Sequence, residues 1–287
     1  MPMKIIPITL LAMLLCLSCA PQDQQESDTP QGKGSLFIIG GGSRPTALVE
    51  RMITEAGLHE QGYAVILPMA SAEPDSAIIW SGEQFTEQGI TALAGFNILP
   101  DVPATPSQLD SIAGASLIYI SGGDQNRFMD IVMETPVMSA IWDAWQGGAM
   151  IAGTSAGAAV MSEKMITGNE RRHPEYQSTF RTIEADNIEI GRGIGLLTTA
   201  IIDQHFVWRS RHNRLISAVI EFPDLLGIGI DESTAILVRG NKAEVVGVSQ
   251  VLVFQNTEHD HRVKDHKLGA KNLRLDIYLP GESFLLH

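Results

Sequence analysis

The sequence predicts an α/β fold: a largely parallel sheet sandwiched by helices, with an antiparallel extension near the C-terminus. Short apolar runs alternate with helix-like segments through the first half of the chain, and several apolar runs follow one another closely in the second half. Parallel neighbours need a crossover of about a dozen residues or more, usually a helix, whereas antiparallel neighbours need only a short turn. The change in spacing therefore marks a change from parallel to antiparallel pairing.

The expected elements follow in chain order. Buried strands are expected at 35–40, 63–68, 96–99, 117–121 and 149–153, with helices at 46–56 and 82–94. An antiparallel meander is expected at 234–238, 243–248 and 251–254, and 273–278 is expected to close a sheet edge. Glycine-rich loops follow three of the strands, at 40–42, 122–123 and 153–157. Because sites of open parallel sheets form at the carboxyl ends of strands, we expect the site among these loops.

The N-terminus is expected to be an export signal. Lys4 precedes an apolar run over 5–17, which is shorter than the roughly 20 residues of a membrane span. Ser18 and Cys19 follow this run in the manner of a bacterial lipoprotein cleavage site, with Cys16 as a departure, so lipidation of Cys19 and simple secretion are the two alternatives. We expect a signal peptide at 1–18, a flexible tether at 19–33 and a single α/β domain at 34–287. The expected location is periplasmic, extracellular or lipid-anchored to the cell envelope.

Composition excludes several classes of function. The formal net charge is −13, which argues against nucleic acid as a partner. Both cysteines lie in the leader, so the folded part has no disulfide, thiol nucleophile or cysteine-based metal site. The glycines at 40–42 lack the spacing of a dinucleotide fingerprint, and no phosphate-loop lysine follows them. We therefore expect neither a metal nor another cofactor.

One turn presents a serine for chemistry. Residues 149–162 read AMIAGTSAGAAVMS, so an apolar strand enters a turn of small residues that begins a helix. This pattern places Ser155 at the edge of the sheet, where Gly153 and Gly157 allow a tight turn and a close approach to backbone N–H groups. The alternative is a strand–helix junction whose small residues only pack tightly.

Two later segments also place polar residues directly after apolar strands. They read DQHF at 203–206, with arginines following, and GIDE at 229–232, with Thr234 and Ala235 following. With GTSAGA at 153–158 and SGGDQ at 121–125, these motifs resemble the cyanophycinase family (serine peptidase family S51, related to the aspartyl dipeptidases) over residues 34–287. The expected fold is then of the class I glutamine amidotransferase-like or flavodoxin-like kind, and the family implies a homodimer.

The resemblance implies a catalytic triad. Ser155 matches the nucleophile, His205 the general base and Glu232 the acid that orients the histidine, while Asp231 competes with Glu232 for that third role. A serine hydroxyl needs an imidazole to accept its proton, and a carboxylate on the far ring nitrogen holds the tautomer. The imidazole then returns the proton to the leaving amine.

An acyl transfer also needs N–H donors for the oxyanion. We expect one from Ala156, which follows the nucleophile, and a second from either Gly122 or Gly123, whose loop ends a neighbouring strand.

A cluster of arginines follows the predicted base. An arginine fork binds carboxylates in bidentate fashion. The resemblance implies that Arg209, Arg211 and Arg214 hold the substrate, with Gln125, Asp203 and Gln204 as further pocket positions. A solvated basic helix face is the alternative, and Asp203 has two candidate partners: an arginine of the substrate or one of the protein.

The function that the resemblance implies is an exported serine-type exopeptidase. It would hydrolyse β-aspartyl linkages and degrade cyanophycin (multi-L-arginyl-poly-L-aspartate) to β-Asp-Arg dipeptides. The alternatives are an aspartyl or isoaspartyl dipeptidase acting on short peptides, and a catalytically inactive, lipid-anchored binding protein. The inactive protein should lack a member of the triad, and all three members are present. The expected partner is a peptide or polypeptide substrate, with membrane contact only through an N-terminal lipid.

Overall fold

The structure is a computed structural model that describes residues 1–2 and 34–286. The predicted tether and Cys19 lie outside the described residues, as does the predicted signal peptide apart from its first two residues. From Gly34 onward the described chain is one compact unit. Within the described residues, no helix combines the length and the apolar character that a membrane crossing requires.

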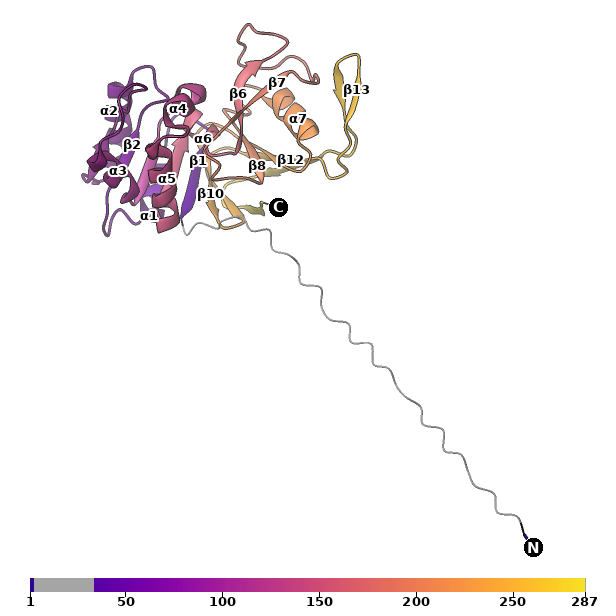
Figure 1. Cartoon of the computed structure of the whole chain (residues 1–287), viewed down its shortest axis with the longest axis horizontal. Coiled ribbons are helices and arrows are strands. Elements are labelled where there is room, and N and C mark those ends of the chain that lie inside the picture. The colour runs from indigo at the N-terminus through magenta and orange to yellow at the C-terminus, as the bar shows by residue number, and fades with distance from the viewer. Residues whose placement is uncertain (3–33, 287) are drawn as a thin grey trace. The chain divides into compact units, whose positions relative to one another are not determined.

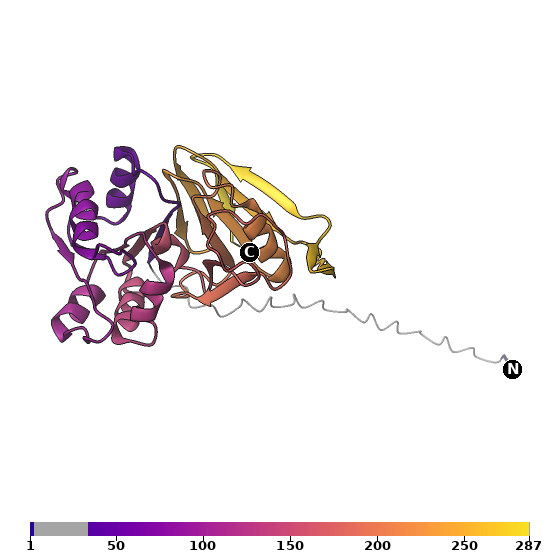
Figure 2. The ribbon, with the colours of Figure 1, turned by 90° about the horizontal axis from the view of Figure 1, so that it is seen from above.

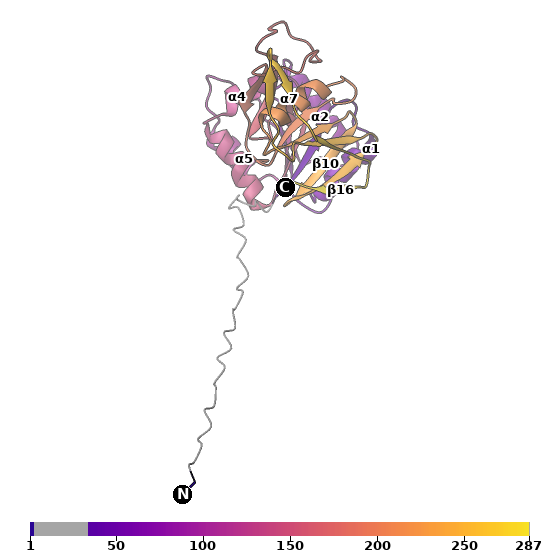
Figure 3. The same ribbon diagram turned by 90° about the vertical axis from the view of Figure 1, so that its right-hand side faces the viewer.

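An eight-stranded sheet forms the centre of this unit (Figure 1). Its spatial order is β16 (Ser283–Leu285), β11 (Lys242–Gly247), β10 (Thr234–Arg239), β1 (Ser35–Ile39), β5 (Met150–Thr154), β4 (Leu117–Ile120), β2 (Ala64–Leu67) and β3 (Leu93–Gly95). The five strands from β1 to β3 are parallel, and the other three are antiparallel. Figure 3 shows β10 and β16 of the antiparallel end on the same side of the molecule as α1 (Thr46–Glu55). The predicted α/β fold with extra antiparallel strands near the C-terminus is confirmed.

Helices cover both faces of this sheet because its strands are apolar on both. Alternate residues of β4 point to opposite faces, so Tyr119 packs with Met52 of α1 and Phe85 of α2 (Pro74–Thr86). Ile118 packs on the other side with Ile141 of α5 (Pro136–Gly147), alongside α3 (Pro106–Ala113) and α4 (Gln125–Val132). Figure 2 shows these helices on two sides of the sheet.

A second, four-stranded sheet lies in the C-terminal half. Its order is β15 (Arg274–Tyr278), β12 (Val251–Gln255), β9 (Leu226–Ile230) and β8 (Ala200–Gln204). Strands β8 and β9 are parallel and are connected through α7 (His212–Glu221), which packs on the sheet through Leu215 and Val219. This right-hand part of Figure 1 also carries two antiparallel pairs of strands, β6 (Lys164–Glu170) with β7 (Ile188–Arg192) and β13 (Arg262–Lys264) with β14 (Lys267–Gly269). Because β8 and β9 are parallel neighbours, their carboxyl ends lie side by side.

Three predicted elements were wrong in position or pairing. The helix expected at 82–94 is α2, which begins at Pro74 and ends at Thr86, because proline suits the first turn of a helix and Gly89 takes a left-handed φ of +81°. The strand expected at 96–99 lies at Leu93–Gly95. The expected meander is broken, since β12 pairs with β9 and not with β11. The segment expected to close a sheet edge does so, but in the four-stranded sheet.

The break in the meander has a local cause. Gly247 takes a φ of +126° at the end of β11, which turns the chain out of the large sheet. The Ser249 N–H then donates to Thr234 Oγ1 at 2.8 Å, and the Asp231 N–H donates to the Gln250 carbonyl at 3.4 Å. These bonds direct the next strand alongside β9.

Candidate active site

The turn after β5 holds Ser155 in a strained backbone conformation. Its φ is 54° and its ψ is −110°, a region that residues other than glycine seldom occupy. A β-carbon at Gly153 would lie 2.3 Å from the carbonyl oxygen of Gly157, and one at Gly157 would lie 2.3 Å from that of Ile120. The turn therefore requires glycine at positions 153 and 157, in agreement with the tight turn that the sequence predicts there.

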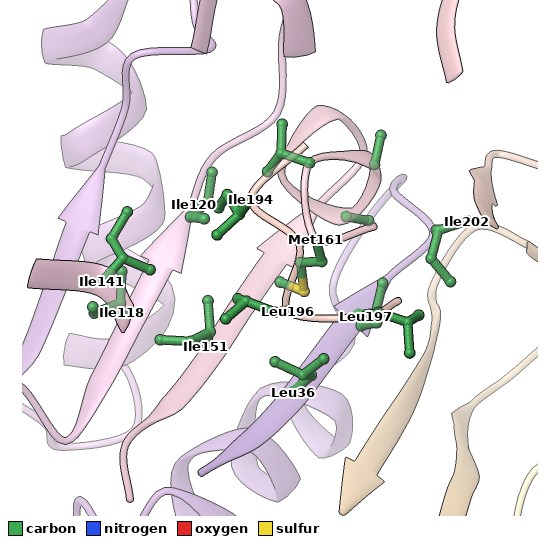
Figure 4. Packing of buried hydrophobic residues seen from close by; sticks show 14 of the residues in the cluster. Leu36, Ile118, Ile120, Ile141, Ile151, Met161, Ile194, Leu196, Leu197 and Ile202 are labelled. Carbon is green, nitrogen blue, oxygen red and sulfur yellow. The ribbon is translucent and has the colours of Figure 1, made fainter. Parts of the chain in front are cut away.

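The helix after this turn is short. α6 spans only Ala156–Ala159, so the helix that the sequence predicts after Ser155 is a single turn. Figure 4 shows the apolar packing around it, with Met161 among Ile120, Ile194 and Leu196. This apolar packing supports the turn that carries Ser155.

Ser155, His205 and Glu232 converge although they come from two different sheets. His205 Nε2 lies 2.8 Å from Ser155 Oγ, and His205 Nδ1 lies 2.5 Å from Glu232 Oε1. Ser155 follows β5 of the eight-stranded sheet, whereas His205 and Glu232 follow β8 and β9 of the other. The order of hydrogen bonds, from hydroxyl to imidazole to carboxylate, is the order in which a serine nucleophile is activated.

The loop after β1 ties the three catalytic segments together. The carbonyl of Ile39, the last residue of β1, and those of Gly40 and Gly41 in the loop accept hydrogen bonds from the N–H groups of Ser155 at 3.1 Å, His205 at 2.7 Å and Ser233 at 2.8 Å, respectively. Three neighbouring peptide groups thus fix the backbones of Ser155, His205 and Ser233, the last of which follows Glu232. The sequence marks this loop as glycine-rich, but its bonds to the segments of Ser155, His205 and Glu232 are visible only in the structure.

The glycines of this loop also lie against the side chains of His205 and Glu232. A β-carbon at Gly41 would lie 2.3 Å from His205 Cε1, and one at Gly42 would lie 2.7 Å from Glu232 Oε2. Both glycines have positive φ angles, +110° and +71°. In the sequence, only the run of three glycines at a strand end indicated that this loop belongs to the site. That two of these glycines make room for His205 and Glu232 follows only from the tertiary contacts.

Burial sets the protonation of the base. The pKa of His205 is lowered from its ordinary value, mainly because burial penalises the charged imidazolium, and its hydrogen bond to Glu232 partly offsets this. The charges of Arg209 and Arg211 lower the pKa further. His205 is therefore neutral at neutral pH and able to accept a proton.

Asp231 and Glu232 have separate partners. The carboxylate of Asp231 accepts the Trp208 N–H at 2.9 Å and the Ser249 hydroxyl at 2.7 Å. Only Glu232 of the two is hydrogen-bonded to His205 in the described chain. Glu232 therefore occupies the position of the orienting acid, and Asp231 fixes the backbone three residues after the base.

The loop at 122–123 lies against the nucleophile. A β-carbon at Gly122 would be 3.4 Å from Ser155 Cβ, and one at Gly123, whose φ is +141°, would be 2.0 Å from the Ala70 carbonyl oxygen. Among the hydrogen bonds of the described residues, none is donated by the N–H of Gly122, Gly123 or Ala156. These groups have the freedom that an oxyanion hole requires, and their role stays a prediction.

Asp203 and Arg214 bind each other inside the protein. Arg214 Nε donates to Asp203 Oδ2 at 2.6 Å, and Arg214 Nη2 donates to Asp203 Oδ1. The two residues are 1% and 2% exposed. Of the two partners considered for Asp203, the structure contains the protein's own arginine.

Arg211 and Gln204 form a second internal pair. The guanidinium of Arg211 donates to the Gln204 carbonyl at 2.8 Å and to its side-chain oxygen, and Nε donates to the Ser178 carbonyl at 3.3 Å. Burial, and then the charge of Arg214, lower the pKa of Arg211 to about 10, so it stays charged at neutral pH. Arg211 and Arg214 thus brace the segment after the base.

The remaining predicted pocket residues are placed differently. The Gln125 amide donates to the carbonyls of Ile166 at 2.9 Å and Thr167 at 2.7 Å, which ties α4 to β6. Arg209 is partly exposed, and its guanidinium makes no hydrogen bond or ion pair to any other described residue. Arg209 is therefore the member of the arginine cluster that is available to a ligand.

Within the described chain, no group of three or more histidine, cysteine or acidic residues could hold a metal ion.

An activated serine with free N–H groups beside it, on an α/β fold, defines a serine hydrolase site. A family model described as peptidase family S51 matches residues 36–246. The chain belongs to this family and is a serine-type peptidase, which confirms the resemblance drawn from the motifs.

Individual relatives agree with this assignment. The chain is 36% identical to a cyanophycinase of Nostoc sp. over 276 residues, covering 91% of this chain and 89% of that protein. It is 30% identical to a cyanophycinase of Synechococcus elongatus, covering 88% and 80%. The crystal structure of a peptidase from an acI-B1 Actinobacterium superposes with a TM-score of 0.63 at 26% identity, covering 88% of this chain and 96% of that one.

Proposed function

We propose that the protein degrades cyanophycin to β-Asp-Arg dipeptides by cutting the backbone amide bond between successive aspartyl residues. This corrects the expected cleavage of β-aspartyl linkages, because the β-Asp-Arg product keeps its β-aspartyl linkage. The observation that carries the proposal is the hydrogen-bonded series Ser155–His205–Glu232 in a chain that is 36% identical to a cyanophycinase. The free guanidinium of Arg209 beside this series supports it, because each arginyl unit of the polymer carries a free carboxylate.

The proposed reaction proceeds through an acyl-enzyme. Ser155 Oγ attacks the scissile carbonyl carbon while His205 Nε2 takes its proton, and Glu232 stabilises the imidazolium. The oxyanion accepts hydrogen bonds from Ala156 and the 122–123 loop. When the C–N bond breaks, the proton passes from His205 to the leaving amine. Water, deprotonated by His205, then hydrolyses the ester and returns Ser155 to its free form.

Product analysis tests the substrate. The purified protein is incubated separately with cyanophycin, short isoaspartyl dipeptides and α-linked peptides, and the products are identified by mass spectrometry. The proposal predicts β-Asp-Arg from cyanophycin and no product with Ser155→Ala. Cleavage of the dipeptides with cyanophycin left intact would assign a dipeptidase instead. Absence of any product, with no reaction of Ser155 toward a serine-reactive probe, would favour a binding protein.

We further propose that the protein acts outside the cytoplasm, because Lys4 and the apolar run over 5–17 have the pattern of an export signal. Cell fractionation and metabolic labelling with palmitate test this. The expected result is a labelled protein in the envelope, with the label lost in Cys19→Ser. An exported but unlabelled protein would indicate simple secretion, and an unprocessed chain in the cytoplasm would contradict export.

A further inference from the structure

We propose that Trp208 determines specificity by binding a guanidinium group of the substrate at the rim of the catalytic site. This proposal rests on the proposed function, since it names the part of the substrate that this rim holds. Trp208 is three residues after His205, and 74% of its surface is exposed. An aromatic side chain of this size normally buries much of its surface, so the exposed indole of Trp208, near His205 in the chain, leaves an aromatic face open to a ligand.

The backbone of Trp208 is fixed next to the acid of the triad. Its N–H donates to Asp231 Oδ1 at 2.9 Å, and the other oxygen of Asp231 accepts the Ser249 hydroxyl at 2.7 Å. Val248, the neighbour of Ser249, donates its N–H to the Ser233 carbonyl at 3.2 Å. The indole is therefore attached at a rigid point one residue from Glu232.

Two more exposed apolar side chains occur in these same segments. Val207 precedes Trp208, and Val248 precedes Ser249; both are exposed. We call Val207, Trp208 and Val248 the apolar rim. The Asp231 carboxylate links the two segments that carry the apolar rim, and Asp231 directly precedes Glu232.

The cationic residue Arg209 directly follows Trp208 in the chain. The charge of Arg209 lowers the pKa of His205, and no other described residue forms an ion pair or hydrogen bond with the Arg209 guanidinium. The backbone of Arg209 is fixed as well, because its carbonyl accepts the Thr179 hydroxyl at 2.5 Å and its N–H donates to the His205 carbonyl at 2.9 Å. Trp208 and Arg209 thus offer an aromatic face and a carboxylate-binding fork at adjacent positions.

These two groups match the two ends of an arginyl unit. Tryptophan is the best aromatic partner for a cation, and a guanidinium also stacks on its plane. An arginyl unit of cyanophycin presents both a guanidinium and a free carboxylate, which Trp208 and Arg209 would bind, respectively. The formal net charge of −13 favours the approach of the cationic end. A neutral or acidic peptide would leave the indole without its preferred contact.

Equilibrium binding to the Ser155→Ala protein tests this assignment. The ligands are a fragment of four β-Asp-Arg units and the same fragment with citrulline in place of arginine, which keeps the shape and removes the charge. Adding Trp208→Ala should weaken binding of the arginyl fragment about five- to tenfold and change binding of the citrullyl fragment less than about twofold. Trp208→Phe should retain most of the affinity. Trp80→Ala removes another exposed tryptophan, on α2, and should leave the affinities for both the arginyl and the citrullyl fragment unchanged.

Unchanged affinity for the arginyl fragment in the Trp208→Ala protein would overturn the proposal. An equal loss for both fragments would also overturn it, because the contact would then not depend on charge. Turnover of the arginyl fragment by the unmodified protein is measured in parallel. If that turnover is absent, the proposed function fails, while the comparison of the two fragments still decides whether Trp208 binds a guanidinium.

Discussion

The imidazole of His205 lies directly against the backbone of Gly41, so closely that a β-carbon on Gly41 would be 2.3 Å from His205 Cε1. The preceding carbonyl, of Gly40, accepts the His205 N–H at 2.7 Å. The loop after β1 therefore holds the base by its main chain and by its ring. Because His205 belongs to one sheet and Ser155 to the other, this loop determines how the two halves of the site meet.

Gly41→Ala should displace the imidazole and lower kcat/KM by about 100-fold or more, because a shift of about 1 Å in a catalytic group costs that much. Steady-state kinetics measures the loss. The matched control is Gly240→Ala, in the turn between β10 and β11: that glycine also has a positive φ, of +56°, but nothing lies within 4 Å of the added carbon. Equal effects of the two substitutions on kcat/KM would show that the Gly41–His205 contact is unimportant.

The pH dependence of kcat/KM should reflect the lowered pKa of His205. Activity requires the neutral imidazole, so the acid limb should have its midpoint below about 6.5, the ordinary histidine value. Arg209 lowers this pKa by its charge, so Arg209→Gln should move the midpoint to higher pH. Arg239→Gln, which removes an exposed arginine paired with Glu55, serves as the control and should leave the midpoint unchanged. A midpoint that stays fixed in Arg209→Gln would contradict this account of the site's electrostatics.

The buried pair of Asp203 and Arg214 should matter for folding. Asp203→Asn leaves the Arg214 charge without its carboxylate and should lower the free energy of unfolding by about 3 to 5 kcal/mol. Denaturant titration measures this value. Glu55→Gln breaks partly exposed pairs with Arg51 and Arg239 and should cost less than about 1 kcal/mol for each pair. If Asp203→Asn costs no more than Glu55→Gln, the pair does not brace the segment after His205.

Glu184 should make stability depend on pH in the acid range. Its hydrogen bonds to Lys267 and then His173 lower its pKa to about 2. Because this pKa lies below that of the unfolded chain, the contribution is complete above about pH 4.5 and is lost as the pH falls toward 2. The difference in free energy of unfolding between the unmodified protein and Glu184→Gln should therefore shrink across that interval. A difference that stays constant from pH 5 to 2 would contradict the assigned pairing.

Much of the fold and the position of each triad residue could be predicted from sequence because both depend on local pattern. Ser155, His205 and Glu232 each come within two residues of the end of an apolar strand, where parallel sheets place their sites. The division into two sheets could not be predicted, since the strand at 251–255 has the same apolar character whether it pairs with β11 or β9. Its partner is decided by long-range bonds from Thr234 and Asp231.

The roles of charged residues were harder to predict for a similar reason. Arg209, Arg211 and Arg214 have the same chemistry and lie close together in sequence, so only geometry shows that Asp203 binds Arg214 while Arg209 stays available. The contact between Gly41 and His205 joins residues 164 positions apart, and a glycine has no side chain whose chemistry could indicate it.

Covalent labelling of the nucleophile tests the central claim most directly, namely that His205 and Glu232 activate Ser155. The purified protein is treated with a fluorophosphonate, and the intact mass and modified peptide are measured. The account predicts one adduct, on Ser155, together with loss of activity, and labelling that slows by orders of magnitude in His205→Ala. An adduct on another residue, or labelling at the same rate without the imidazole, would contradict it.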